Sequence, residues 1–236
     1  MRPGKVVGLK EAELTSISDT LATKKEKTAV NQPQLDELIN CVSNHDSKRL
    51  SEILEQALIQ QGLNSFIIET VAPLIYTNGN KWAKGELKIF EEHFITRQLT
   101  QFLDSVNSKI PLVSNAKTVI LATLPGEPHS LGILMLESLL RNKGIMVVNL
   151  GTEVPMDQLV LAYEQYKPGA ILLSFSGSYN SNGLRIELLD LAQRLPDDIP
   201  VYIGGGGVKS MRKMPKQIII KNQLKDVSEL DINQTP

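Results

Sequence analysis

Apolar residues in the first half of the chain recur at three- and four-residue spacing, the period of one buried helix face. The pattern predicts one helix that begins at Gln34 and a second that ends at Gly62. A third helix is expected over 63–82, with a kink at Pro73, and a fourth over 86–106. Four helices with short connections indicate a helical bundle.

From about residue 117 the pattern changes to short apolar runs that alternate with helical segments. Strands fit residues 118–124, 145–150, 169–175 and 200–204, and more weakly 217–221, with helices near 132–143, 155–165 and 182–194. This alternation predicts a doubly wound parallel sheet. The chain is thus expected to be a multidomain α and α/β protein: an N-terminal extension or linker (1–32), a helical-bundle cap (33–108), an α/β domain (117–225) and a flexible tail (226–236).

Composition narrows the class of protein. The 236 residues are 42% apolar with a formal net charge of −1, which is ordinary for a folded soluble protein and gives no strong field for nucleic acid. Cys41 is the one cysteine, so an intrachain disulfide and a cysteine metal cluster are excluded. No apolar run approaches the roughly 20 residues of a membrane span, and no signal peptide follows Met1. A cytoplasmic protein is therefore expected.

One histidine follows the first predicted strand. The hexapeptide Glu127-Pro128-His129-Ser130-Leu131-Gly132 lies between the apolar run 119–124 and the helical run 133–140. This places the histidine at the carboxyl edge of the sheet, where α/β proteins bind ligands. An imidazole can bind a metal through one ring nitrogen, while a carboxylate two residues earlier accepts the proton of the other. Taken alone, a loop histidine is more often a solvated or packed side chain.

Two later elements occur in order with this hexapeptide. Forty-one residues separate Gly132 from Ser174-Phe175-Ser176, and 27 residues separate Ser176 from Gly204-Gly205. The three elements resemble the signature of the cobalamin (B12)-binding domain shared by methionine synthases, corrinoid methyl carriers and some regulators. That signature is Asp-x-His-x-x-Gly, Ser-x-Leu and Gly-Gly. Glu127 stands in place of the aspartate, and Ser176 in place of the leucine.

The resemblance implies a flavodoxin-like domain with cobalamin as its cofactor. In this family pattern, His129 would be the lower axial cobalt ligand, oriented by Glu127. Ser174 and the glycines at 204–207 would hold the displaced nucleotide tail, with Gly132 and Ser176 completing the binding motif. Glu127 keeps the family's carboxylate and adds one methylene, whereas Ser176 weakens one apolar wall contact.

The helical half carries a second resemblance. Trp82 is followed after nine residues by Glu92-His93, which is similar to the Trp-x9-Glu-His signature of the helical cap in light-sensing regulators of the MerR family. In those photoreceptors the bundle covers the upper face of the corrin, and these residues contact the adenosyl group. The resemblance therefore favours adenosylcobalamin over methylcobalamin. In some of these regulators a histidine follows the tryptophan and captures cobalt after illumination, whereas here the position is Ala83.

The expected role is therefore a cobalamin-dependent sensor in transcription regulation. The stretch 2–14 resembles the end of a MerR DNA-binding domain, but no helix-turn-helix pattern is visible. We expect no direct DNA binding by this chain alone, and action through a homo-oligomer or a protein partner. No constellation for independent catalysis is present, so we expect no enzyme. Two alternatives stay open: a corrinoid methyl-carrier protein of a methyltransferase system, and a cobalamin-independent interaction protein.

Overall fold

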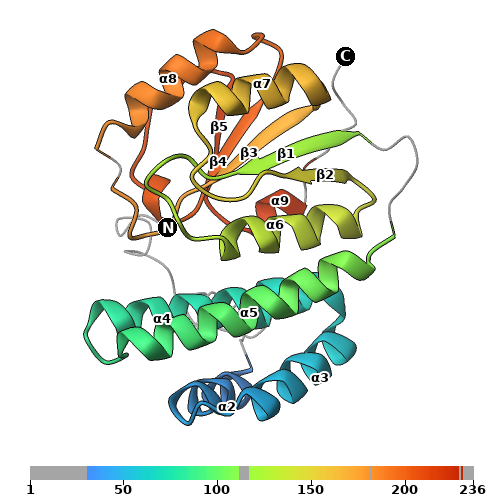
Figure 1. Cartoon of the computed structure of the whole chain (residues 1–236), viewed down its shortest axis with the longest axis vertical. Helices are drawn as coiled ribbons and strands as arrows, with labels where there is room; N and C mark the ends of the chain where they lie inside the picture. The colour runs from blue at the N-terminus through green and yellow to red at the C-terminus, as the bar shows by residue number, and fades with distance from the viewer. Residues whose placement is uncertain (1–30, 112–116, 181, 229, 231–236) are drawn as a thin grey trace, which may run out of the picture.

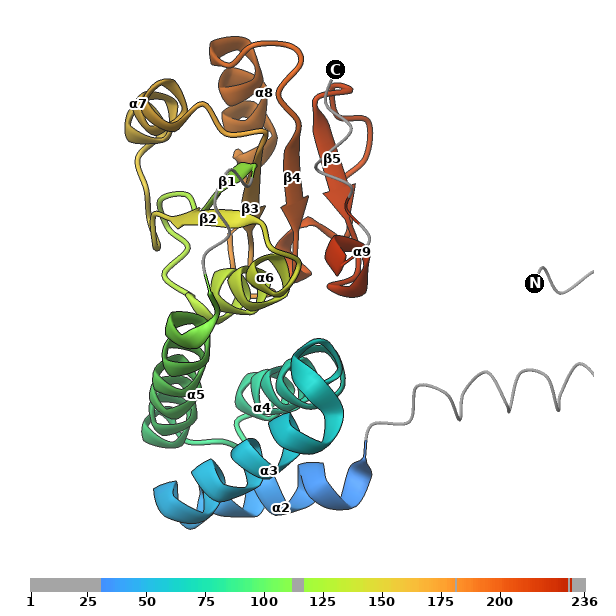
Figure 2. The same cartoon turned by 90° about the vertical axis from the view of Figure 1, so that its right-hand side faces the viewer.

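A helical half and an α/β half lie one above the other along the long axis of the molecule (Figures 1 and 2). The computed structural model describes residues 31–111, 117–180, 182–228 and 230. The expected N-terminal extension up to residue 30 and the end of the tail, 231–236, lie outside the described residues. No helix among those described is long and apolar enough to cross a membrane.

The bundle consists of helices that follow the predicted periodicity. Its elements are α2 (Gln32–Ser43), α3 (Ser47–Ser65), η2 (Phe66–Val71), α4 (Ala72–Ala83) and α5 (Ile89–Lys109). The apolar positions that predicted a buried face are buried, among them Leu38, Leu50 and Leu99. The predicted helical half is therefore confirmed.

Two helices differ from the predicted continuous segments. The third consists of the end of α3, the π-helical turn η2 and then α4, with Pro73 in the first turn of α4. Proline is tolerated there because the backbone donor it lacks has no partner in a first turn. Gly62 interrupts the preceding helix with φ 72°. The fourth helix begins at Ile89 rather than residue 86, because Lys88 is extended and donates its backbone N–H to Glu91 at 2.8 Å.

The α/β half contains five parallel strands in the order β2-β1-β3-β4-β5. The strands are β1 (Thr118–Ala122), β2 (Met146–Asn149), β3 (Ala170–Ser174), β4 (Val201–Gly204) and β5 (Ile218–Lys221). The weak fifth candidate is thus a true strand. This order is that of the flavodoxin-like doubly wound fold, whose ligands bind where the strand order reverses, between β1 and β3. The predicted fold class is confirmed.

Helices cover both faces of the sheet (Figure 1). One face packs against α6 (Leu131–Asn142) and α9 (Lys225–Ser228), and the other against α7 (Met156–Tyr166) and α8 (Leu184–Arg194). Along β1, Val119 and Leu121 point to the α6 face, while Ile120 and Ala122 point to the α7–α8 face. This alternation follows from the two-residue period of a strand.

The two halves meet along α5 and α6, which lie side by side (Figures 1 and 2). Four apolar residues of α6 belong to the same core as the bundle: Leu131, Leu134, Met135 and Leu139. A buried polar contact lies in this interface, where Ser138 Oγ donates to Asn107 Oδ1 at 2.6 Å and Asn107 Nδ2 donates to the Leu134 carbonyl at 3.3 Å. Helix α6 therefore connects the sheet to the bundle, and its first turn follows directly on His129.

Candidate functional site

Glu127 and His129 form a hydrogen-bonded pair in the loop between β1 and α6. Glu127 is buried, with 1% of its surface exposed, and its Oε1 lies 2.5 Å from His129 Nδ1. The same oxygen accepts the backbone N–H of His129 at 3.1 Å. The other oxygen, Oε2, accepts the backbone N–H of Ser176 at 2.5 Å. Each carboxylate oxygen is therefore fixed by a donor from the loop after β1 or the loop after β3.

The two side chains stabilise each other's charged forms. Burial by itself raises the pKa of Glu127, but the hydrogen bonds from His129 and Ser176 outweigh it and hold this pKa below its usual value. The hydrogen bond to Glu127 raises the pKa of His129 despite partial burial of the ring, and the charges of Glu127 and Glu92 add to this effect. Half of the His129 side chain is exposed. Glu127 thus favours the proton on Nδ1, which leaves Nε2 as the free lone pair when the ring is neutral.

Ser176 belongs to this pair rather than to an apolar wall. Its Oγ lies 3.2 Å from His129 Nδ1 and 3.0 Å from Ser178 Oγ. Its hydroxyl also lowers the pKa of Glu127. The residue that departs from the family's leucine therefore contacts both members of the Glu127–His129 pair. The sequence spacing did not indicate this contact, because it joins two loops that are 49 residues apart.

A pocket of about 240 Å³ lies between α6 and the carboxyl ends of β3, β4 and β5, and its lining includes Gly132, three residues after His129. Its walls are mostly apolar, with Leu172, Leu173 and Ile203 from the strands and Met135 and Leu136 from α6. The polar residues on its lining include Ser174, Lys209, Lys221, Asn222 and Gln223. Mostly apolar walls with a few polar groups are typical of a site that binds a small molecule.

Glycines keep this pocket open and bring the loops together. A Cβ on Gly132 of α6 would collide with Ser174 Oγ, so the helix can approach β3 this closely with glycine alone. Gly205 has φ 99°, and a Cβ there would collide with the Phe175 carbonyl. A Cβ on Gly206 would lie 2.7 Å from Gly177 Cα. Gly204, Gly205 and Gly206 line the pocket, and Gly207 packs against Ser176 instead.

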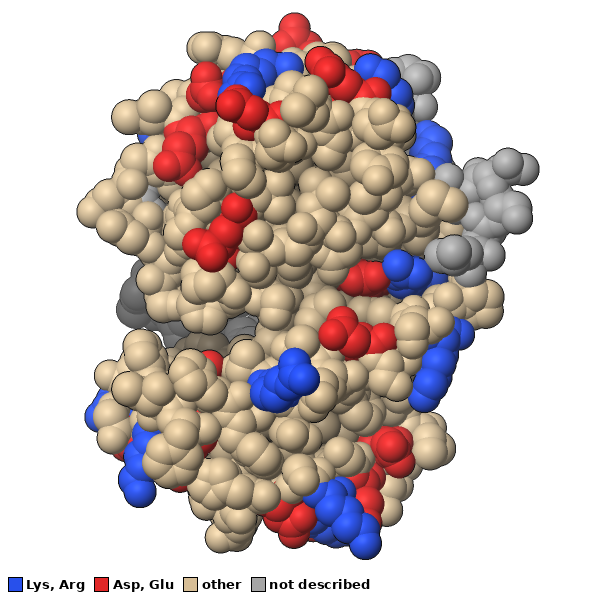
Figure 3. Space-filling view, in the orientation of Figure 1, with Lys and Arg blue, Asp and Glu red and all other residues tan. Residues whose placement is uncertain are grey.

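The bundle residues Trp82, Glu92 and His93 lie on the same side of the molecule as the carboxyl edge of the sheet. Trp82 is near the end of α4 and 47% exposed, while Glu92 and His93 are in the first turns of α5. Both helix ends lie on the left in Figure 1, toward which β1 also points. The influence of Glu92 on the pKa of His129 is a second sign that the halves meet here. On this side the outline of the molecule is notched between its two halves (Figure 3).

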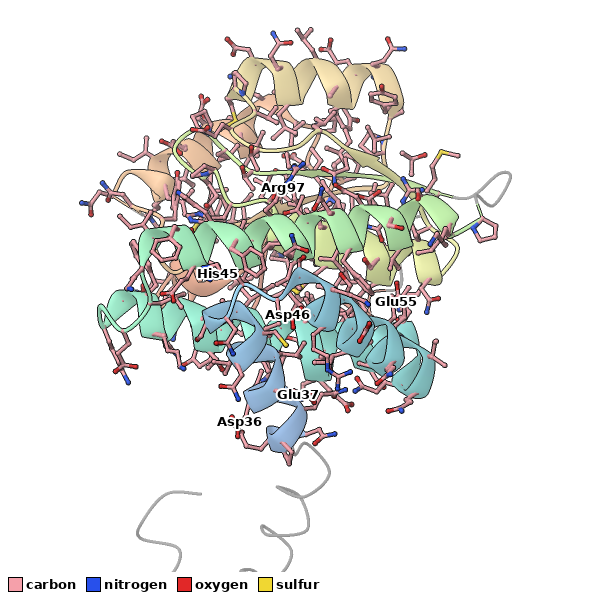
Figure 4. The ribbon with its side chains drawn as sticks, turned by 60° about the horizontal axis from the view of Figure 1, so that its bottom comes forward. Asp36, Glu37, His45, Asp46, Glu55 and Arg97 are labelled. Carbon is pink, nitrogen blue, oxygen red and sulfur yellow. The ribbon has the colours of Figure 1, made fainter. Side chains whose placement is uncertain are left out.

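Within this group, the Glu92 carboxylate makes contacts through both of its oxygens. Its Oε2 lies 2.9 Å from His93 Nδ1, and its Oε1 accepts the Thr96 hydroxyl at 2.7 Å. His93 is 74% exposed, so its ring is free to contact a ligand or solvent. The third histidine, His45, lies in the turn between α2 and α3 (Figure 4). Its ring stacks on that of Phe90, with 5.2 Å between the ring centroids. His45 is thus occupied in packing the bundle.

The metal-binding side chains at this edge of the sheet suit a metal that is already held by a macrocycle. Among the described residues, no group of three or more His, Cys, Asp or Glu side chains could hold a bare ion. His129 offers a single imidazole nitrogen, which is what a metal with four equatorial ring nitrogens lacks on one face. The adjacent pocket could accept a tail attached to such a ring. The residues on this edge therefore fit a corrinoid.

Comparison with known proteins agrees with this chemistry. Two family models match the chain, each described as a B12 binding domain, one over residues 34–106 and the other over residues 117–221. Residues 34–106 and 117–221 of this chain therefore belong to the B12-binding family. The helical and α/β halves are each a recognised part of a cobalamin-binding module, and the expected resemblance is confirmed.

The most similar proteins include two regulators from Myxococcus xanthus. The cobalamin-binding module is 28% identical over 176 residues to the HTH-type transcriptional repressor CarH, a match that covers 75% of this chain and 58% of the repressor. It is 25% identical over 213 residues to the repressor CarA, covering 89% of this chain and 72% of CarA. The chain thus spans 58% of the length of CarH.

A solved structure shares the two-part fold. The monomethylamine corrinoid protein of Methanosarcina barkeri superposes with a TM-score of 0.68, covering 84% of this chain and 97% of that protein, at 17% sequence identity. At this identity the likeness establishes the architecture and nothing finer. A helical cap followed by a doubly wound sheet is therefore common to a corrinoid protein and to this module.

Proposed function

We propose that this chain is the cobalamin-dependent sensor part of a transcriptional regulator, with His129 as the lower axial ligand to cobalt. The observation that carries the proposal is the Glu127–His129 pair, with Oε1 2.5 Å from Nδ1 and the His129 side chain half exposed. Glu127 would hold the ring so that Nε2 faces the metal. When bound, cobalamin supplies a cobalt centre whose upper ligand can be exchanged.

The pocket between α6 and the sheet is proposed to hold the nucleotide tail. Ser174 offers a hydroxyl for a ring nitrogen of the lower base, and the apolar walls suit the flat faces of that base. The missing side chain of Gly132 leaves the Ser174 hydroxyl in place at the pocket wall. Gly204 to Gly206 would bring backbone against the tail.

Trp82, Glu92 and His93 are proposed to cover the upper ligand, which favours adenosylcobalamin over methylcobalamin. The support is their common position at the end of the bundle nearest His129, together with the exposure of Trp82 and His93. An adenosyl group is larger than a methyl group and offers more surface for these side chains to cover. Loss of that group would remove a contact between the two halves of the module.

Signalling would follow from this loss of contact. The bundle and the α/β half share an interface along α5 and α6, so a change at the upper ligand can alter how the bundle rests on α6. A changed surface would then alter a homo-oligomer or a contact with a protein partner. The similarity to the repressors CarH and CarA supports transcription control as the output.

Light is proposed as the signal, through a route that does not use the residue after Trp82. Ala83 has no metal-binding group, and His93, whose side chain is 74% exposed next to Glu92, is the bundle histidine proposed for this role. The test is to mix the purified chain with adenosylcobalamin in the dark, and to record the absorption spectrum and the size of the complex before and after illumination. A light-dependent change in both is expected. Binding with no such change would eliminate the photoreceptor role and keep the cofactor site.

The second candidate is a corrinoid methyl carrier for a methyltransferase system. The observation that favours it is the shared two-part fold, with a TM-score of 0.68 to a corrinoid protein. Competitive titration distinguishes the two roles. Tighter binding of adenosylcobalamin is expected for the sensor, and tighter binding of methylcobalamin would favour the carrier.

A further inference from the structure

Thr123 connects the β1–α6 loop to the β2–α7 loop at the edge of the cofactor site. It is the first residue after β1, is fully buried, and makes four hydrogen bonds. Its hydroxyl donates to the Glu127 carbonyl at 2.5 Å and accepts the Glu153 N–H at 2.9 Å. Its backbone N–H donates to the Gly151 carbonyl at 3.1 Å, and its carbonyl accepts the Val154 N–H at 2.9 Å. The β2–α7 loop therefore forms hydrogen bonds with the backbone N–H, the hydroxyl and the carbonyl of Thr123.

Glu153 closes the same connection from the other loop. Its carboxylate accepts the Gly126 N–H at 3.3 Å, directly before Glu127. Its φ is 56°, a left-handed conformation that is unfavourable for a residue with a side chain. Such a conformation persists when surrounding contacts hold it in place, and here the Thr123 hydroxyl is one of these contacts. We call Thr123, Gly126, Glu127 and Glu153 the loop clasp.

The loop clasp acts on the backbone of Glu127, whose side chain orients His129. The carbonyl of Glu127 is bonded to Thr123, while its carboxylate is bonded to His129 and Ser176. Rotation of this residue would move all three bonds together. The Thr123 hydroxyl and the Leu124 carbonyl, which accepts the Glu127 N–H at 3.1 Å, together hold the backbone from which this buried carboxylate projects.

We propose that Thr123 is a positioning residue for the cobalt ligand: its hydroxyl fixes the Glu127 backbone, and so the His129 ring, to the β2–α7 loop. The proposal rests on the proposed function of His129 as the lower ligand. Nothing in the family signature includes Thr123 or Glu153. A consequence is that a partner or variant that moves the β2–α7 loop changes how well cobalamin is held.

The test compares Thr123→Val with Thr123→Ser. Valine keeps the shape and removes the hydroxyl, and serine restores the hydroxyl. The matched control is Thr70→Val in the bundle, where a buried hydroxyl donates to Gln61 Oε1 at 2.9 Å and makes no hydrogen bond to the loop clasp. Amide hydrogen exchange of the Glu153 and Ser176 N–H groups is measured by NMR on the protein without cofactor. Cobalamin affinity is then measured by absorbance titration.

For Thr123→Val we expect at least tenfold faster exchange at Glu153 and Ser176, and about 10- to 100-fold weaker cobalamin binding, the usual loss for an outer partner of a metal ligand. Thr123→Ser should remain within about twofold of the wild type, as should Thr70→Val. Unchanged exchange and affinity in Thr123→Val would overturn the proposal, as would an equal loss in Thr70→Val. If the wild type itself binds no cobalamin, the proposed function fails, while the exchange rates still decide whether Thr123 positions Glu127.

Discussion

A methyl group added at position 132 tests the close approach of α6 to β3. In Gly132→Ala, the new Cβ would lie closer than 3.0 Å to Ser174 Oγ and 3.3 Å from Ser174 Cβ. Ordinary carbon contacts are about 3.5–4.0 Å. Either α6 shifts or the Ser174 side chain rotates. Gly132 and Ser174 both line the pocket. The change should therefore reduce stability and cobalamin affinity together.

The size of the effect follows from two opposing contributions. Overpacking a close contact costs about 1–3 kcal/mol. Alanine is more favourable than glycine in a helix by at most about 1 kcal/mol. We expect Gly132→Ala to be destabilised by about 0.5–2 kcal/mol. In a Ser174→Ala background the collision with Oγ is removed, and the 3.3 Å contact with Cβ is a mild one. The two substitutions should then be coupled by about 1 kcal/mol or more.

Urea unfolding of the protein without cofactor measures this coupling from the wild type, both single variants and the double variant. Gly79→Ala is the matched control, because Gly79 lies in α4 and a Cβ there has nothing within 4 Å. This control should be stabilised by about 0.5–1 kcal/mol. The reasoning about this contact would be refuted if Gly132→Ala were also stabilised. It would be refuted as well if Gly132→Ala lowered the free energy of unfolding equally in the wild-type and Ser174→Ala backgrounds.

Three other predictions concern different parts of the module. The raised pKa of His129 contributes stability that is fully present below pH 6.5, its ordinary pKa, and is lost as pH rises through the raised pKa. The lowered pKa of Glu127 contributes stability that is fully present above pH 4.5, its ordinary pKa, and is lost as pH falls through the lowered pKa. The melting temperature of the wild type without cofactor should therefore exceed that of His129→Ala most between pH 4.5 and 6.5, and a difference independent of pH would contradict the ion pair. Ser138→Ala removes the donor to buried Asn107 and should cost about 1–3 kcal/mol in urea unfolding, whereas a loss below about 0.5 kcal/mol would mean that this contact is not formed. Trp82→Ala should weaken adenosylcobalamin more than methylcobalamin in absorbance titrations, and equal weakening would remove Trp82 from the upper-ligand side.

The hydrophobic periods predicted the fold because each period is set by one element's own geometry. The apolar run from Val119 to Ala122 is buried on both faces of a parallel strand, and the three- and four-residue spacing marks α2 to α5. The π-helical turn before Pro73 and the start of α5 at Ile89 were not predicted. The start of α5 depends on the hydrogen bond that satisfies its end, and the π-helical turn is a local change of hydrogen bonding inside a helical run. The apolar period carries neither.

The candidate site was predictable where its residues are close in sequence. Glu127 and His129 are two residues apart within one element of the family signature, so the resemblance placed a carboxylate beside an imidazole. The contact of the Ser176 hydroxyl with this pair, and the hydrogen bonds of Thr123, depend on how loops from different strands meet. The nearness of Glu92 to His129 depends on how α5 packs on α6. Such contacts leave no local pattern, and the fold is needed to reveal them.

Electron paramagnetic resonance of bound cob(II)alamin tests the central claim most directly. The protein is prepared with 15N-labelled histidine, and the cofactor is left unlabelled. If His129 is the axial ligand, each cobalt line is split into a doublet by the spin-½ 15N nucleus, and His129→Ala abolishes this doublet. A triplet from unlabelled 14N in the labelled protein would mean that the cofactor's own base stays on cobalt, and would contradict the account.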